Sequence, residues 1–334
     1  MQLKVPKQMI AAILGIVFLA TQTSAEMKAE NTPAMETTLR TISSQLNSTK
    51  MLESDTAKQG LEAIHNQLFF PDYVSYTNIA HFKDMDSLKQ YLYNIDKEAY
   101  VTEQDLDIDR LLAQDLSVDF SGEEPKILIF HTHSQERFAD SGEGIEDSIV
   151  GVGAELVRIL AEDYGITAMH HLGKYDVVDG KTSTAGAYER MEVEIMQTLA
   201  DNPSIEVCID LHRDALPDGM KLLWDNNGVP TSPIMYFNGM SRRIHNGEIQ
   251  ELDHLPNPHQ EENLALSLQM KLLSNELYPG FTRKNYIRAY RYSLHMLGKS
   301  MLVEVGSHAN TVEESYNAMQ PFAEILVQTL MPTK

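Results

Sequence analysis

From residue 126 onward the chain repeats one order of elements: a short apolar run of strand length, then a longer segment with helical spacing. The runs of strand length are 126–130, 166–169, 205–210, 232–237 and 301–305. The segments with helical spacing are 149–164, 187–200, 263–277 and 312–330. Continuous apolar runs fit strands that are buried on both faces. We therefore expect an α/β fold with a mostly parallel sheet and helices on both faces.

The first 25 residues have the pattern of an export signal. Lys4 and Lys7 precede an apolar run over 9–20, and small residues follow up to Ala25. A membrane-spanning helix needs roughly 20 apolar residues, so this run is short for one. Residues 1–25 are predicted to be either a cleaved signal peptide or a retained membrane anchor. Both alternatives place the protein outside the cytoplasm, anchored or secreted toward the cell wall.

Residues 26–122 are polar and acidic, with helix-like patches at 46–68 and 86–95 and few apolar runs of strand length. We interpret this region as a spacer or a small helical module. The composition changes at the turn-rich stretch 121–125. The sequence therefore predicts a catalytic domain over 123–334.

Net charge and cysteine content limit the partners and the disulfide bonds that the chain can have. The formal net charge of -21 argues against a nucleic-acid partner, because phosphate binding requires clustered Lys and Arg. The single cysteine, Cys208, rules out a disulfide within the chain. It stands in the apolar stretch 205–211, where a buried structural role is expected.

Three of the predicted strands end in residues that can bind a metal. The motifs are His-Thr-His-Ser-Gln-Glu at 131–136, Asp-Leu-His-Arg-Asp at 210–214 and Glu-Val-Gly-Ser-His at 304–308. In open α/β sheets ligands bind beyond the carboxyl ends of the strands. One histidine at a strand end is usually structural, but two histidines and two carboxylates at three such ends favour a metal site.

A catalytic zinc takes three histidine or carboxylate ligands and leaves one position for water. His131, Glu136 and His212 are the candidate ligands. The zinc lowers the pKa of the water, and a separate carboxylate must then move its proton. Glu304 leaves an apolar strand, where burial would raise its pKa, and is the candidate for that role.

In these motifs the chain resembles the stage II sporulation protein P family, exported peptidoglycan hydrolases of endospore-forming bacteria. The resemblance covers roughly Leu106 to the C-terminus. It is carried by residues 129–136, 152–156, 209–214 and 302–306, and by Asn310, Thr311, Glu313 and Glu314.

The last motif is also similar to the wider fold of zinc-dependent N-acetylmuramoyl-L-alanine amidases. This resemblance implies that Glu304 is catalytic and that His212 is the second histidine ligand. The first ligand is then His131 or, two residues on, His133. For the third, Glu136 is favoured and Glu146 is its rival.

Further residues of the motifs have candidate roles around the metal. Side chains two apart on a strand share a face, so one of His131 and His133 could bind metal and the other could contact substrate. Asp214 is a candidate for orienting a ligand histidine. Arg213 either contacts a substrate carboxylate or forms a structural salt bridge.

The resemblance implies hydrolysis of the amide between N-acetylmuramic acid and the stem peptide, together with endopeptidase activity on cross-links. It places the reaction in engulfment during sporulation, with a lytic transglycosylase and a membrane protein as partners. One alternative is a catalytically silent scaffold that binds peptidoglycan. Another is a zinc carboxypeptidase-like enzyme, which would release a terminal amino acid instead of an intact stem peptide.

Overall fold

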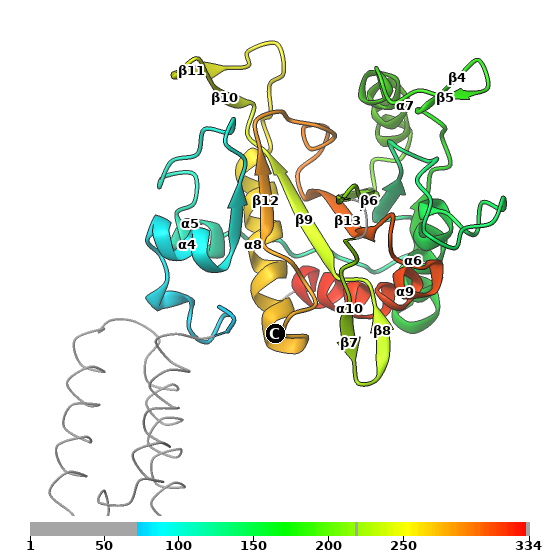
Figure 1. Ribbon diagram of the computed structural model, residues 1–334, viewed down its shortest axis with the longest axis horizontal. Coiled ribbons are helices and arrows are strands. Elements are labelled where there is room, and N and C mark those ends of the chain that lie inside the picture. Colours follow the sequence, from blue (N-terminus) through cyan, green and yellow to red (C-terminus); the bar gives the residue numbers. More distant parts are fainter. Residues whose placement is uncertain (1–71, 218–219, 332–334) are drawn as a thin grey trace, which may run out of the picture. The chain divides into compact units, whose positions relative to one another are not determined.

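A seven-stranded sheet forms the centre of the computed structural model, which describes residues 72–217 and 220–331 (Figure 1). In spatial order its strands are β1 (Tyr93–Ile95), β12 (Asn285–Arg288), β9 (Ile234–Gly239), β13 (Ser300–Ser307), β6 (Val207–Asp214), β2 (Ile127–Phe130) and β3 (Ala168–His170). The first three strands are parallel to one another, and so are the last four. Only the β9–β13 pair at the centre is antiparallel. The predicted mostly parallel sheet is confirmed.

Helices cover both faces of this sheet, as predicted. On β2, Ile127 and Ile129 point into the larger core, which also contains side chains of α6 (Ile149–Tyr164), α8 (Gln260–Leu277) and α10 (Met319–Leu330). Leu128 and Phe130 point to the other face, against α7 (Ala187–Asp201). This alternation explains why β2 is apolar at every position.

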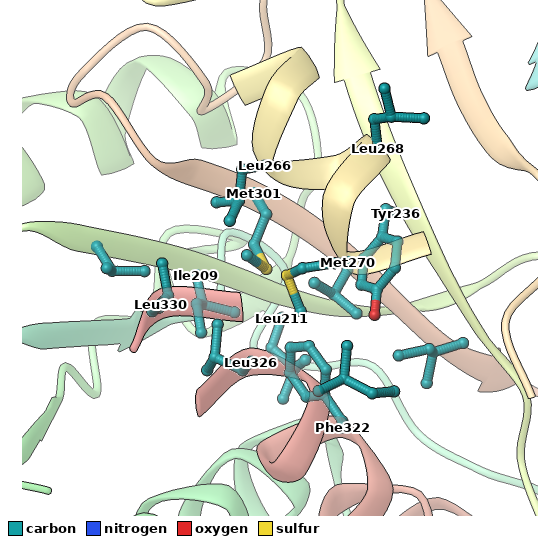
Figure 2. Close-up of a cluster of buried hydrophobic side chains, with 14 of the residues drawn as sticks. Ile209, Leu211, Tyr236, Leu266, Leu268, Met270, Met301, Phe322, Leu326 and Leu330 are labelled. Carbon is teal, nitrogen blue, oxygen red and sulfur yellow. The ribbon is translucent and has the colours of Figure 1, made fainter. Parts of the chain in front are cut away.

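The larger core fixes the strands that carry the predicted site. Figure 2 shows buried side chains from β6, β9, β13, α8 and α10 in one cluster: Ile209, Leu211, Tyr236, Leu266, Leu268, Met270, Met301, Phe322, Leu326 and Leu330. Ile209 and Leu211 of β6 lie in this core, so Asp210 and His212 point to the opposite face. Met301 and Val303 place Glu304 of β13 on that same opposite face.

The predicted helix 149–164 is confirmed residue for residue. The Ser148 side chain accepts a hydrogen bond from the Val150 backbone at the N-terminus, and Gly165 ends the helix in the left-handed conformation at φ 66°. The predicted helix 312–330 is instead two helices, α9 (Val312–Asn317) and α10. Pro321 explains the break, because its ring would clash with the carbonyl of Asn317 in a continuous helix.

The compact unit begins well before residue 123. It spans Pro71–Lys334, and β1 forms an edge strand of the central sheet. Leu88 of α4 (Met85–Tyr91) and Leu111 of α5 (Ile108–Leu112) are buried in the larger core. The predicted spacer 26–122 therefore contributes its second half to the same domain, and the expected helix over 86–95 is α4 followed by β1. The predicted signal at 1–25 and the patch at 46–68 lie outside the described residues.

Short elements complete the fold. They are η2 (Ile79–His81) and the hairpins β4 (Val177–Val178) with β5 (Lys181–Thr182), β7 (Trp224–Asn226) with β8 (Val229–Thr231), and β10 (Arg242–His245) with β11 (Glu248–Glu251). Across the described ranges, no helix combines the length and the apolar character needed to cross a membrane.

Lys271 of α8 is a buried cation without a carboxylate partner among the described residues. Its Nζ donates to the Thr282 carbonyl (2.6 Å), the Thr282 hydroxyl (2.9 Å) and the Asn275 side-chain oxygen (3.1 Å). Burial, with a smaller contribution from Lys284, lowers the pKa of Lys271 from 10.5 to about 7.

This lysine is expected to make the free energy of unfolding rise with pH. Between pH 7 and 10.5 the unfolded chain holds the proton that the folded chain has released, so folding is favoured as pH increases. From pH 7 to pH 9 wild type should gain about 2 kcal/mol relative to Lys271→Met. Chemical denaturation of both proteins at the two pH values measures this, and equal pH slopes would contradict it.

Candidate active site

The three strand ends singled out in the sequence lie side by side. β13, β6 and β2 are consecutive strands of the sheet, all parallel, so their carboxyl ends meet at one edge. Glu304 and His212 are paired residues of β13 and β6. Both side chains are on the sheet face that carries α7. The expected convergence of the motifs is therefore present.

His131 is buried at the end of β2, and both of its ring nitrogens have partners. Nδ1 lies 2.8 Å from the carbonyl oxygen of Leu211, and Nε2 lies 2.9 Å from Nε2 of His170 on β3. Burial, reinforced by His170, lowers the pKa of His131 to about 3. Gly153 of α6 leaves room for the ring, since a Cβ there would lie 2.7 Å from it. His131 is thus neutral and held between β6 and β3.

His133, and not His131, makes a ring contact with His212. The two ring centroids are 5.2 Å apart in an edge-on arrangement. His133 Nδ1 is buried and has no hydrogen-bond partner among the residues that the structure describes. Burial and the neighbouring His212 lower the pKa of His133, which favours the neutral form that binds metals.

Glu136 is the carboxylate that approaches His212 from the first motif. Its Oε2 lies 3.7 Å from His212 Nδ1 and accepts a hydrogen bond of 2.8 Å from the Arg213 backbone. Glu146 is exposed, and its carboxylate is turned toward Gly144. Of the two glutamates that the sequence left open, only Glu136 contacts a motif histidine.

The other side of the His212 ring faces a carboxylate that the sequence analysis left without a role. His212 Nε2 lies 2.7 Å from Asp210 Oδ1. Asp210 also accepts hydrogen bonds from the backbone and hydroxyl of Thr132, at 2.9 and 2.7 Å. Burial opposes protonation of His212, but Asp210 and Glu136 outweigh it and raise the pKa of this histidine well above its ordinary value.

Glu304 completes the cluster as a carboxyl group with little solvation. Its Oε2 is buried and has no hydrogen-bond partner within the described ranges. Burial raises the pKa of Glu304 to about 8, with Glu136 adding to the increase and His212 opposing it. The side chain can therefore both accept and release a proton near neutral pH.

Arg213 and Asp214 both make structural contacts. The Arg213 guanidinium donates to the carbonyls of Arg137 (2.9 Å) and Asp214 (3.3 Å), and so ties the first two motifs together. Asp214 forms a salt bridge with Arg283 at 2.7 Å. The carboxylate next to the His212 ring is that of Asp210, whereas Asp214 is engaged with Arg283.

Tyr188 of α7 forms a wall of the site that the sequence analysis missed. Its ring packs edge-on against His133, with centroids 5.6 Å apart, and against Tyr292, at 5.4 Å. Burial and the nearby Asp210 raise the pKa of Tyr188 well above its ordinary value, so it remains a neutral phenol. No sequence signal distinguishes this tyrosine, because a helix facing a sheet has aromatic residues for packing alone.

The histidine and carboxylate side chains of the site are of the types that bind a metal ion, although they do not converge closely on one point. Among residues 72–217 and 220–331, no three His, Cys, Asp or Glu side chains are close enough to form a ready metal site. Yet the 3.7 Å between Glu136 Oε2 and His212 Nδ1 is less than two zinc–ligand bonds of roughly 2.0–2.1 Å. His133 Nδ1 nearby lacks a partner, which is costly for a buried polar atom. Asp210 on the far side of His212 is typical of a carboxylate that orients a zinc-bound histidine.

The chain is similar in structure to several N-acetylmuramoyl-L-alanine amidases. One is the CwlD amidase from Clostridioides difficile, solved in complex with the GerS lipoprotein (14% identity, 60% of this chain and 95% of that chain, TM-score 0.36). Others are AmiC2 of Nostoc punctiforme (14%, 62% and 98%, TM-score 0.34) and the apo form of Ami1 from Mycobacterium abscessus (15%, 62% and 97%, TM-score 0.35). A comparison with curated proteins finds no match.

The family comparison extends the resemblance seen in the motifs. The match to the family described as stage II sporulation protein P covers residues 20–327 and thus begins well before Leu106. It includes all three strand-end motifs and the whole region expected to be a spacer. The chain belongs to the stage II sporulation protein P family.

Proposed function

We propose that this protein is a zinc-dependent hydrolase of the cell wall that cleaves the amide between N-acetylmuramic acid and the stem peptide. The observation that carries the proposal is the pairing of Glu304 with His212, which is itself beside His133 and Glu136. A poorly solvated carboxyl group next to a set of metal-binding side chains is the minimum that metal-assisted amide hydrolysis requires. Family membership supports a role in engulfment during sporulation.

His133, Glu136 and His212 are the side chains that would hold the zinc. His133 takes the place that the motif spacing gave to His131, because both nitrogens of His131 are already engaged. Bound there, zinc would lower the pKa of a water molecule and polarise the scissile carbonyl. Asp210 lies 2.7 Å from Nε2 of His212, while Nδ1 on the other side of the ring is 3.7 Å from Glu136.

Glu304 is the proton carrier of the proposed reaction. Its raised pKa places proton uptake and release close to neutral pH, where general acid–base catalysis is most effective. It would take a proton from the attacking water and deliver it to the leaving amine. Tyr188, packed against His133, limits access of bulk water to that side of the site.

The direct test is digestion of purified peptidoglycan by the full chain, with mass analysis of the products. Release of intact stem peptides supports the amidase. Shortened cross-links would add the endopeptidase activity, and free terminal amino acids would indicate a carboxypeptidase instead. Absence of any soluble product would refute hydrolysis.

Removal of the metal is expected to abolish this digestion. Dialysis against a chelator should reduce the rate of digestion to background, and added zinc should restore it. The zinc-binding side chains alone cannot do what the cation does in the reaction. Metal analysis should find about one zinc per chain in the active protein. Unchanged binding to peptidoglycan with no zinc and no digestion would favour the silent scaffold.

Export is part of the proposal, since the substrate is outside the cytoplasm. Residues 1–25 would direct it, as a cleaved signal or as an anchor. Cell fractionation with an antibody to the folded domain separates the two outcomes by location and size. The lytic transglycosylase and the membrane-protein partner rest on the family resemblance alone.

A further inference from the structure

A cavity of about 710 Å³ lies one strand away from Glu304. Met235 lines this cavity, and on β9 it pairs with Glu304 of β13. Paired residues of neighbouring strands point to the same face of a sheet. At Met235 the cavity therefore opens on the active-site face, and it extends past the start of β12 to β1 at the edge of the sheet.

The cavity is lined by cations, although the chain has a net charge of -21. Lys89, Lys97, Arg283 and Lys284 line it, with Asp96 as the one carboxylate. The carboxylate of Asp96 already has partners within the protein. It accepts a hydrogen bond from Tyr286 (3.0 Å) and lies 3.5 Å from Arg288. Burial opposes ionisation, but hydrogen bonds and the charges of Arg288 and Lys97 keep the pKa of Asp96 low.

Among the residues that the structure describes, three of the four cations form no ion pair. Within the described ranges, no carboxylate oxygen lies within 4.0 Å of the side-chain nitrogen of Lys89, Lys97 or Lys284. Lys284 is held in place by donating to the Lys89 carbonyl at 3.0 Å. Arg283 is paired with Asp214, which connects the cavity to the end of β6. Like charges gathered in a concave surface repel one another and attract an anion.

We infer that this cavity is a subsite of the substrate groove that binds free carboxylates of the stem peptide. The inference rests on the proposed function, which places the scissile amide at Glu304 and therefore the peptide within one strand of the cavity. Lysine ammonium groups bind carboxylates through charge-assisted hydrogen bonds. The subsite would select walls whose stem peptides carry free carboxylates over walls in which these groups are amidated.

Equilibrium binding tests the subsite without depending on catalysis. The probes are a fluorescent stem peptide with free carboxylates and the same peptide fully amidated, added to the full-length protein. The double variant Lys97→Gln, Lys284→Gln should raise the Kd for the free peptide about 10-fold, equivalent to roughly 1.4 kcal/mol. Its Kd for the amidated peptide should not change. The 10-fold difference should shrink as salt is added, because the lysines are exposed.

Lys181→Gln is the matched control. Lys181 is exposed on the β4–β5 hairpin, on the far side of the molecule from β1 and β12 (Figure 1), and its replacement removes the same charge. It should leave both Kd values unchanged. Three results would overturn the subsite: equal loss in the control, equal Kd values for the two peptides in wild type, or no binding of the free peptide. Peptidoglycan digestion by the same preparation reports separately on the proposed function.

Discussion

Glu304→Gln is expected to slow the release of stem peptides by roughly 100- to 10,000-fold, the range of a lost general acid–base. Glutamine preserves the shape of the side chain but cannot accept a proton. The group is poorly solvated, and its pKa of about 8 suits proton transfer near neutral pH. Zinc content should remain at the wild-type level, because Glu304 is not among the proposed ligands. Product release measured by mass spectrometry, beside metal analysis, separates these two effects.

Glu146→Gln provides the matched control for this experiment. Glu146 is an exposed carboxylate from the same part of the sequence as Glu136, and its side chain contacts none of the clustered residues. The control should digest peptidoglycan at the wild-type rate. If Glu304→Gln also does so, another group moves the proton. If Glu304→Gln instead loses its zinc, the carboxyl group is a ligand and its proposed role is wrong.

The elements that the sequence predicted well are those whose stability is local. The helix 149–164 has a serine cap, a regular apolar face and a glycine at its end, so each boundary has a physical cause within a few residues. Strand β2 is apolar throughout, and β6 and β13 each contain a run of three apolar residues before their first charged residue, as expected of strands at the centre of a sheet.

The order of strands depends on contacts between distant residues and could not be derived in the same way. β1 has three residues, too few to show alternation, and it is a strand because β12, almost 200 residues later, offers it an edge. The reversal between β9 and β13 leaves no mark in the sequence, because a buried strand is apolar in either direction. For the same reason the domain boundary was predicted too late.

For the site, the sequence predicted which strand ends carry the functional residues. It did not predict where side chains beyond the end of a strand point. The rule that residues two apart share a face holds along a strand, and β2 ends at Phe130. The chain turns after that residue, so His131 faces His170 while His133 faces His212. Within β6 the rule does hold, and it could have identified Asp210 beside His212.

His133→Ala and His131→Ala form the pair that distinguishes ligand from structural histidine. His133→Ala should lower zinc affinity and peptidoglycan digestion by at least about 100-fold, more than the loss of a residue that only orients a ligand. Its free energy of unfolding without metal should fall less than that of His131→Ala, because the variant loses ring contacts with Tyr188 and His212 but no hydrogen bond at Nδ1 among the described residues.

His131→Ala should have the opposite effect. It leaves the Leu211 carbonyl and His170 without their buried partner, which costs about 1–3 kcal/mol of stability. Protein that remains folded should still bind zinc, because none of the proposed ligands depends on His131 for a hydrogen bond. Zinc titration and chemical denaturation of both variants measure the two effects. If His131→Ala lost zinc at unchanged stability while His133→Ala retained it, the ligand would be His131, and its contact with His170 would have to open for the metal to bind.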